Sequence, residues 1–167
     1  MNMVIAKWNL IQPSLLDRLT DDAPRATFES ANFYNFSLSK MQALILRDVS
    51  WLLNATQLAA TIDLRSYPHV EASTLNYGVR ALAAVESLDA NDLGQEIAYS
   101  LQLFEPRLLA ETVKVTPLPD AHSSGPFGFR IEADLWAQPV PLRIVMRTDV
   151  DGGRGIVRIV ETTSERN

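Results

Sequence analysis

Residues 93–108 read LGQEIAYSLQLFEPRL, and this stretch indicates the fold more directly than any other part of the chain. Four apolar residues recur in it at helical spacing, which predicts a helix with one face in the core: Leu93, Ile97, Leu101 and Phe104. Asp89 or Asn91 can cap its start. Pro106 ends the helix, because a residue that precedes proline disfavours the α conformation. We therefore predict a core helix that stops at residue 105.

An acid and a base flank this proline. In an extended segment, residues two apart project to the same side, so we expect Glu105 and Arg107 to form an exposed pair. An exposed ion pair contributes only about 0–1 kcal/mol to stability. Two interpretations therefore remain open. The pair either completes the helix end locally, which the residues alone favour, or binds matching charges on a partner.

Upstream of this stretch the pattern is helical. Gln12-Pro13-Ser14 opens a short helix that runs through Leu19. A longer helix begins after Ser37 or Ser39 and ends at Asn54, with an apolar stripe at 3.6-residue spacing. Its polar face carries Arg47 and Asp48. Residues 61–78 are predicted to form a connecting loop, and a short helix is expected over residues 79–85.

Downstream of Arg107 the apolar period changes to two, which predicts strands. We expect strands over residues 112–115, 129–135, 142–147 and 156–160, with a hairpin at residues 151–153. The predicted fold class is α+β: N-terminal helices packed on a C-terminal antiparallel β-meander, in a single domain. We place a flexible N-terminal arm at residues 1–12, the domain at 13–161 and a polar tail at 162–167.

Composition narrows the class of protein. The chain has 167 residues, of which 47% are hydrophobic, and this suits one domain with a substantial core. It has no cysteine, so a disulfide or a thiolate metal site is excluded and a cytoplasmic location is expected. A formal charge of -5 argues against general nucleic-acid binding. No long apolar run is present, so no membrane insertion is expected.

Catalytic chemistry is poorly supported. His69 and His122 are the only histidines, and they give no metal-ligand spacing, so we expect no metal and no cofactor. Glycoside hydrolysis needs two carboxyls around one bond, and the candidates are Asp92, Glu96, Glu105, Glu132 and Asp134. Glu132 and Asp134 share the exposed face of one predicted strand, opposite Arg143 and Arg147 on the next. Arginine neighbours lower a carboxyl pKa, which is the wrong direction for a general acid.

Four segments, taken together, resemble one known family. They are Ser14 to Leu19 (SLLDRL), Arg47 to Asn54 (RDVSWLLN), Tyr67-Pro68 with Ser73 to Gly78 (STLNYG), and Leu103 to Leu108 with its Glu-Pro-Arg motif. The order and spacing of these segments are similar to those of the small baseplate wedge proteins of contractile injection machines, which include type VI secretion systems and phage tails. The likeness runs from about Ser14 to Val160.

The resemblance implies a structural protein rather than an enzyme. Its partners would be the wedge proteins TssF, TssG and TssK and the contractile sheath subunits. Glu105, Pro106 and Arg107 would dock into the wedge, and the first sheath ring would add by strand exchange at an open sheet edge. The candidate edge residues are Thr112, Val113 and Val115 in one strand and Ile156, Val157, Arg158 and Ile159 in another.

Two alternatives remain from the sequence. Part of the same family carries a lysozyme label, so a peptidoglycan hydrolase is one alternative. A soluble anti-adaptor-type regulator, which works only by binding a partner, is the other.

Overall fold

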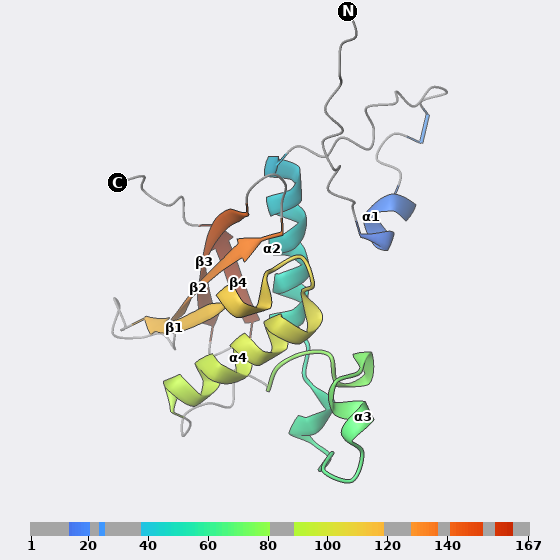
Figure 1. Ribbon diagram of the computed structural model, residues 1–167, viewed down its shortest axis with the longest axis vertical. Coiled ribbons are helices and arrows are strands. Elements are labelled where there is room, and N and C mark those ends of the chain that lie inside the picture. The colour runs from blue at the N-terminus through green and yellow to red at the C-terminus, as the bar shows by residue number, and fades with distance from the viewer. Residues whose placement is uncertain are drawn as a thin grey trace, which may run out of the picture.

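The chain folds as helices followed by a four-stranded antiparallel sheet (Figure 1). The computed structural model describes residues 14–20, 24–25, 38–80, 89–118, 128–136, 141–151 and 156–161. The strands pair in the order β1-β2-β3-β4, so the sheet is a simple meander. The predicted α+β class is confirmed. The expected arm at residues 1–12 and tail at 162–167 lie outside the described residues.

Three helices begin and end close to the predicted positions: α1 (Leu15–Leu19), α2 (Leu38–Asn54) and α4 (Ala90–Phe104). The helix α3 (Pro68–Glu71) lies within residues 61–78, where we expected only a connecting loop. Short 3-10 helices occur at Leu58–Ala60, Thr74–Asn76 and Ala110–Thr112. The Ser14 side chain caps α1 by accepting from the Asp17 N–H at 3.3 Å, and the Asp89 carboxylate caps α4 by accepting from the Asn91 N–H at 2.8 Å. Such caps satisfy N–H groups that have no partner within the helix.

The segment after Gly78 differs from the prediction. Val79 forms a parallel bridge with Thr56 instead of opening a helix. Residues 81–88 of the expected helix lie outside the described part of the chain.

The strands are β1 (Lys114–Leu118), β2 (Gly128–Leu135), β3 (Leu142–Asp151) and β4 (Ile156–Glu161). The start of the first strand was predicted wrongly: Thr112 ends a 3-10 helix, and Val113 caps that helix. The physical reason is the Thr112 hydroxyl, which donates to the Leu109 carbonyl oxygen at 2.7 Å and accepts from the Asp134 N–H at 2.9 Å. These side-chain bonds replace backbone pairing at Thr112, and the strand begins two residues later.

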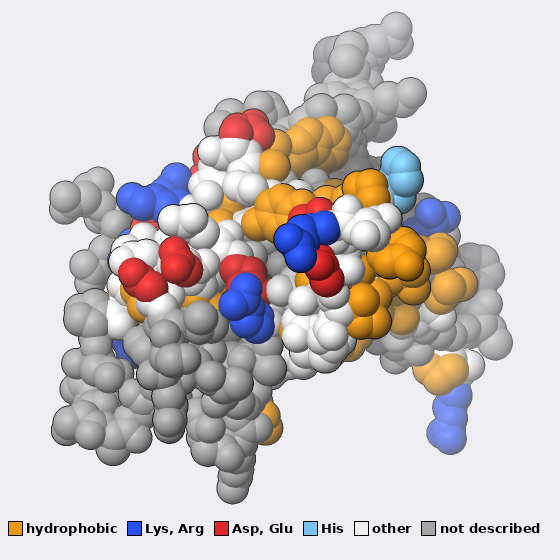
Figure 2. Space-filling model, turned by 90° about the horizontal axis from the view of Figure 1, so that it is seen from below, with side chains coloured by type: hydrophobic (Ala, Val, Ile, Leu, Met, Phe, Trp, Pro, Cys, Tyr) orange, Lys and Arg blue, Asp and Glu red, His pale blue; other side chains and the backbone are white. Residues whose placement is uncertain are grey.

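Hydrogen bonds of the Asn76 side chain and of the Gly78 backbone fix the loop between α2 and α4. Asn76 is buried, and its side chain accepts from the Ala59 N–H at 2.9 Å and donates to the Glu71 carbonyl oxygen at 3.0 Å. Gly78 has a φ of 127°, and its carbonyl oxygen accepts from the Ser100 hydroxyl at 2.9 Å. The loop folds into α3 and its neighbouring turns, and Figure 2, seen from this end, shows hydrophobic side chains gathered on that face.

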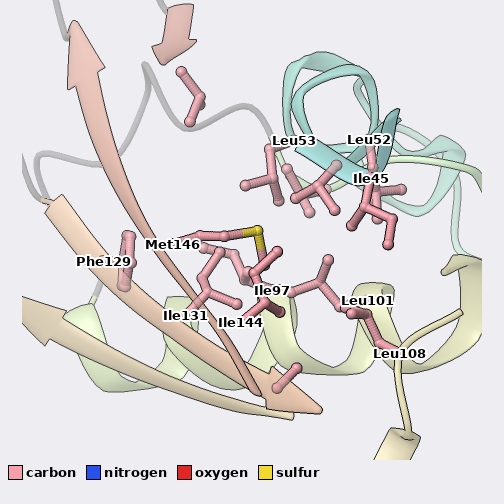
Figure 3. Close-up of a cluster of buried hydrophobic side chains, with 14 of the residues drawn as sticks. Ile45, Leu52, Leu53, Ile97, Leu101, Leu108, Phe129, Ile131, Ile144 and Met146 are labelled. Carbon is pink, nitrogen blue, oxygen red and sulfur yellow. The ribbon is translucent and has the colours of Figure 1, made fainter. Parts of the chain in front are cut away.

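The core lies between the sheet and helices α2 and α4, which pack against β4 and β1 respectively. Figure 3 shows the side chains that meet there: Ile45, Leu52 and Leu53 from α2, Ile97 and Leu101 from α4, Leu108, and Phe129, Ile131, Ile144 and Met146 from the sheet. The apolar face of α4 is therefore structural, as its spacing predicted. Leu108 joins this core directly after the helix ends, which anchors the turn at Pro106.

We expect Gly78→Ala to destabilise the protein by about 3 kcal/mol, because a side chain at this φ is strained and the methyl group has no room. A Cβ at residue 78 would lie 2.3 Å from the Ala55 carbonyl oxygen. Urea denaturation measures the change. Gly94→Ala is the matched control, since its nearest neighbour would be 3.7 Å away, and alanine within a helix is favoured by about 1 kcal/mol. Equal effects of the two changes would contradict this account of Gly78.

Candidate functional site

The Glu105-Pro106-Arg107 turn is fixed between the end of α4 and the end of β2. Glu105 caps the helix, and its carbonyl oxygen accepts from the Leu108 N–H at 3.1 Å. On the sheet side, the Arg107 carbonyl oxygen accepts from the Trp136 N–H at 2.8 Å. Pro106 lacks an N–H, so ending the helix here costs no backbone hydrogen bond. The turn is therefore held rigidly by backbone contacts on both sides.

Glu105 and Arg107 form the predicted pair, but the pair is not exposed as we expected. Arg107 Nε donates to Glu105 Oε1 at 2.6 Å, and Arg107 Nη2 contacts Glu105 Oε2. Glu105 is only 4% exposed and the Arg107 side chain only 20%. The local pairing rule identified the contact, but burial depends on how α2 packs against this turn. The expectation of a surface pair was wrong.

Arg107 also reaches across to α2, where its Nη2 donates to Asp48 Oδ2 at 2.6 Å. Arg47 bonds the same Asp48 and forms an ion pair with Asp17 of α1 at 2.8 Å. Five charged side chains, Asp17, Arg47, Asp48, Glu105 and Arg107, thus form one chain of contacts, which we call the charge network. It joins α1, α2 and the Glu-Pro-Arg turn.

The pKa shifts in the charge network follow from these contacts. Burial alone would lower the pKa of Arg107, but Glu105 and Asp48 raise it above its ordinary value. Burial alone would raise the pKa of Asp17, but the Ser14 hydroxyl and Arg47 lower it below its usual range. Both shifts favour the charged form, so at neutral pH these two groups remain ionised. Arg107 and Asp17 therefore act as fixed charges within the network.

An open groove of about 380 Å³ lies beside the charge network. It is lined by Ser14, Leu16, Asp48, Val49, Trp51, Leu52, Tyr77, Phe104, Glu105, Pro106 and Arg107. Trp51 is 50% exposed and Leu16 47% exposed, so the groove has apolar side chains at its surface. The Arg47 guanidinium lies 4.8 Å from the Trp51 ring centroid, which stabilises the ring through a cation–π contact. The groove thus combines an apolar lining with a rigid charged wall.

Tyr77 and Phe104 make one side of this groove. Their ring centroids are 5.4 Å apart in an edge-on arrangement. Burial and the nearby Asp48 raise the pKa of the Tyr77 hydroxyl, so that hydroxyl stays neutral. Tyr77 of the STLNYG segment therefore belongs to the same site as the Glu-Pro-Arg turn.

Four of the five carboxyls weighed for hydrolysis, Glu96, Glu105, Glu132 and Asp134, are paired with other side chains. Glu132 accepts from Arg130 at 2.7 Å and from Arg143 at 2.9 Å, and Arg143 lies 3.5 Å from Asp134. Arg130 lowers the pKa of Glu132, burial opposes this and Arg143 adds to it. The predicted cross-strand pairs of Arg143 are confirmed. Arg147 instead pairs with Asp149 at 3.2 Å, its neighbour two residues along β3. Glu96 is held by Gln57 and Arg80.

All the residues predicted for one edge lie in the edge strand β4, but only one of those predicted for the other edge lies in the edge strand β1. Val115 lies in β1, while Thr112 and Val113 lie before it. All four predicted residues of the other edge, Ile156, Val157, Arg158 and Ile159, lie in β4. Val157 has its backbone bonded by the Asn54 side chain, which accepts from its N–H and donates to its carbonyl oxygen, both at 2.9 Å.

The residues that sequence reasoning missed at these sites include Asp17, Asp48 and Asn54. Asp48 is a charge on the polar side of an amphipathic helix, and such a residue normally faces water. The sequence signal for an ion pair at Asp48 was the arginine directly before it, Arg47. The local sequence indicates Asn54 only as the residue that ends α2. Nothing local indicates that its amide bonds a strand about a hundred residues later in the chain.

Among the described residues there is no cluster of histidine, aspartate or glutamate side chains that could hold a metal ion. No helix in the described ranges is both long and apolar enough to cross a bilayer.

Helices packed against an antiparallel meander, with the Glu-Pro-Arg turn at the end of α4, make this chain an α+β domain. The chain belongs to the family of the baseplate wedge protein gp25, whose family model matches residues 39–140, more than half of the 167-residue chain. No curated protein and no solved structure gives a significant match. Family membership supports a structural role in a phage-baseplate-like assembly with other baseplate proteins.

We expect Arg107→Ala to destabilise the protein by about 2–4 kcal/mol, because it leaves the buried Glu105 carboxylate without its partner. Thermal and urea denaturation measure this. Adding Glu105→Gln should recover part of the loss, since it removes the unpaired charge. Arg65→Ala is the control: Arg65 pairs with Asp63 at 2.6 Å but is 90% exposed, so its loss should not be measurable. An effect of Arg107→Ala as small as that of Arg65→Ala would contradict the buried role.

Glu132 gives a pH-dependent prediction. Its folded pKa lies below its unfolded value, so its ion pairs stabilise the protein above the unfolded pKa. This contribution is lost as the pH falls through the folded pKa. We expect Glu132→Gln to be less stable than the wild type at pH 7, with the difference vanishing at acid pH in urea titrations. Glu111→Gln, at an exposed site with no ion pair among the described residues, is the control. A difference that is constant with pH would refute the assignment.

Proposed function

We propose that this chain is the wedge subunit of a type VI secretion baseplate, the role of TssE, and that it works in the cytoplasm as an assembly protein rather than an enzyme. The partners would be TssF, TssG and TssK, together with the contractile sheath subunits. Membership of the wedge family supports the general role. The SLLDRL, RDVSWLLN and STLNYG segments support the type VI assignment, because all three contribute residues to the groove beside the Glu-Pro-Arg turn.

The groove is the observation that carries the proposal. A rigid hollow with exposed Trp51 and Leu16 is suited to an apolar side chain of a partner, and exposed aromatic residues are frequent anchors of interfaces. Because Glu105 is buried, a partner meets the exposed Pro106 and the groove rather than the acid itself. In this proposal the Glu105–Arg107 pair acts indirectly, by holding the groove in one shape before binding.

A structural role also agrees with the state of the carboxyls. A general acid needs a raised pKa, and the pKa of Glu132 is lowered by its arginine neighbours. The Glu105 carboxylate accepts a hydrogen bond from Arg107, so it is already paired. No observation on the described residues favours the hydrolase or the anti-adaptor alternative over assembly.

Sheath templating is the second part of the proposed role. The sheet ends in two edge strands, β1 and β4, and an edge strand can accept a strand of a partner through backbone hydrogen bonds. In this proposal the wedge binds through the groove, and the first sheath ring adds at a sheet edge.

We expect Trp51→Glu to weaken binding to a purified TssF–TssG complex at least tenfold, because a carboxylate in the groove loses the apolar contact and lies next to Asp48. Pull-down and calorimetry measure it. Tyr99→Glu is the matched control, since Tyr99 is also an aromatic residue of a helix with 50% exposure but does not line the groove. Its binding should stay unchanged. Equal binding by both variants, with folding intact, would refute the groove as the wedge contact.

A further inference from the structure

We infer that Arg130 and Arg147 form a carboxylate-binding site on the outer face of the sheet, and that its occupant is an acidic segment of another protein. The outer face is the one turned away from α2 and α4. We call these two residues the arginine pair. The site lies outside the groove beside the Glu-Pro-Arg turn, so it goes beyond the proposed wedge contact and does not depend on it.

Alternation along the two central strands places the arginine pair on the outer face. In β2, Arg130 lies between Phe129 and Ile131, which are both buried in the core. In β3, Arg147 follows the buried Met146. Successive side chains of a strand point to opposite faces of the sheet, so both arginines point away from the core. Their side chains are 51% and 50% exposed, and a ligand can therefore reach them.

The two arginines lie directly opposite each other in the antiparallel register of β2 and β3. Side chains in such a position have Cβ atoms about 4.5–5.5 Å apart, and like charges there destabilise the sheet. Other charged pairs on this face are complementary: Asp134 lies opposite Arg143, and Asp149 lies opposite Arg158. The arginine pair is thus a local conflict in a face that otherwise pairs opposite charges. Such conflicts are expected where a residue serves function rather than stability.

Each member of the arginine pair uses only one edge of its guanidinium within the chain. Arg130 Nε donates to Glu132 Oε1 at 2.7 Å, and Arg147 Nε donates to Asp149 Oδ1 at 3.2 Å. In the part of the chain that the structure describes, the Nη1 and Nη2 atoms of both arginines have no hydrogen-bond partner. A guanidinium binds a carboxylate through parallel N–H bonds. A carboxylate between the two guanidiniums would fill these donors and offset the repulsion of the pair.

Arg143, on the same face, shows what a satisfied arginine looks like here. Its Nη2 donates to Glu132 at 2.9 Å, and its Nη1 lies 3.5 Å from Asp134. Its side chain is 51% exposed, as that of Arg130 is. Arg143 therefore matches Arg130 in charge and exposure, but carboxylates of the chain already occupy both of its Nη atoms.

The surrounding charges indicate that the occupant is a carboxylate of a protein rather than a nucleic acid. Glu132, Asp134 and Asp149 lie on the same face as the arginine pair, and the whole chain has a formal charge of -5. A nucleic acid presents a continuous row of phosphates and needs an extended basic surface, which these acids interrupt. A single carboxylate needs only the space between two guanidiniums. Charge complementarity of this kind gives an interface its specificity.

Titration of the full chain with a tetraglutamate peptide tests the site, with NMR of the backbone amides and the arginine Nε–H groups as the readout. We expect Arg130→Gln and Arg147→Gln each to weaken binding about tenfold, the loss expected for a hydrogen bond between charged groups. Arg143→Gln is the matched control. It removes the same charge but no free donor, so it should weaken binding less than twofold. Equal weakening by all three variants, or no binding by the wild type, would overturn the inference.

Three other probes test the nature of the occupant. A tetraglutamine peptide has no carboxylate and should not shift the signals of the arginine pair. Equal binding of the two peptides would overturn the inference. Inorganic phosphate and a single-stranded DNA oligonucleotide should bind the pair more weakly than tetraglutamate. If either binds there more tightly, the assignment to an acidic protein segment is wrong.

The conflict within the arginine pair has a test that needs no ligand. Arg130→Gln removes the ion pair with Glu132 but also relieves the repulsion from Arg147. Urea denaturation should therefore show a larger loss of stability from Arg130→Gln in the Arg147→Gln background than in the wild type, and a double-mutant cycle isolates this difference. Equal losses in the two backgrounds would show that the arginines do not repel each other, and the inference would fail.

Discussion

The buried contact between Glu105 and Arg107, extended to Asp48, is the interaction on which the site depends. Burying an unpaired carboxylate costs folding free energy. Glu105 is only 4% exposed, so it requires Arg107 as its partner. The arginine in turn brings the end of α4 against the middle of α2. The groove forms between these two elements, with Trp51 and Leu16 at its surface. Its shape therefore follows from satisfying one buried charge.

Hydrogen bonds of side chains to the backbone give the sheet two different edges. Asn54 bonds both backbone groups of Val157 as a neighbouring strand would. Pro117 removes a donor from the opposite edge.

Periodic patterns predicted most of the fold. The apolar spacing of α2 and α4 and the alternation along β2, β3 and β4 placed these elements within a few residues of their observed bounds. One error occurred where a side chain replaced backbone pairing, at Thr112, whose hydroxyl bonds Leu109 and Asp134. Another occurred at Val79, which forms a bridge with Thr56 instead of opening a helix. Glu105 and Arg107 were recognised as partners because they are two residues apart, but Asp48 and Asn54 were not, because their partners are far away in the sequence.

The sequence by itself determined the order of elements, the end of α4 at Pro106 and the pairing of Glu105 with Arg107. These are local consequences of spacing and of proline's missing N–H. The burial of that pair, the charge network from Asp17 to Arg107 and the blocked edge at Val157 were decided only by tertiary structure. Burial and long-range hydrogen bonds depend on which surfaces meet, and no local pattern of charge or hydrophobicity specifies that.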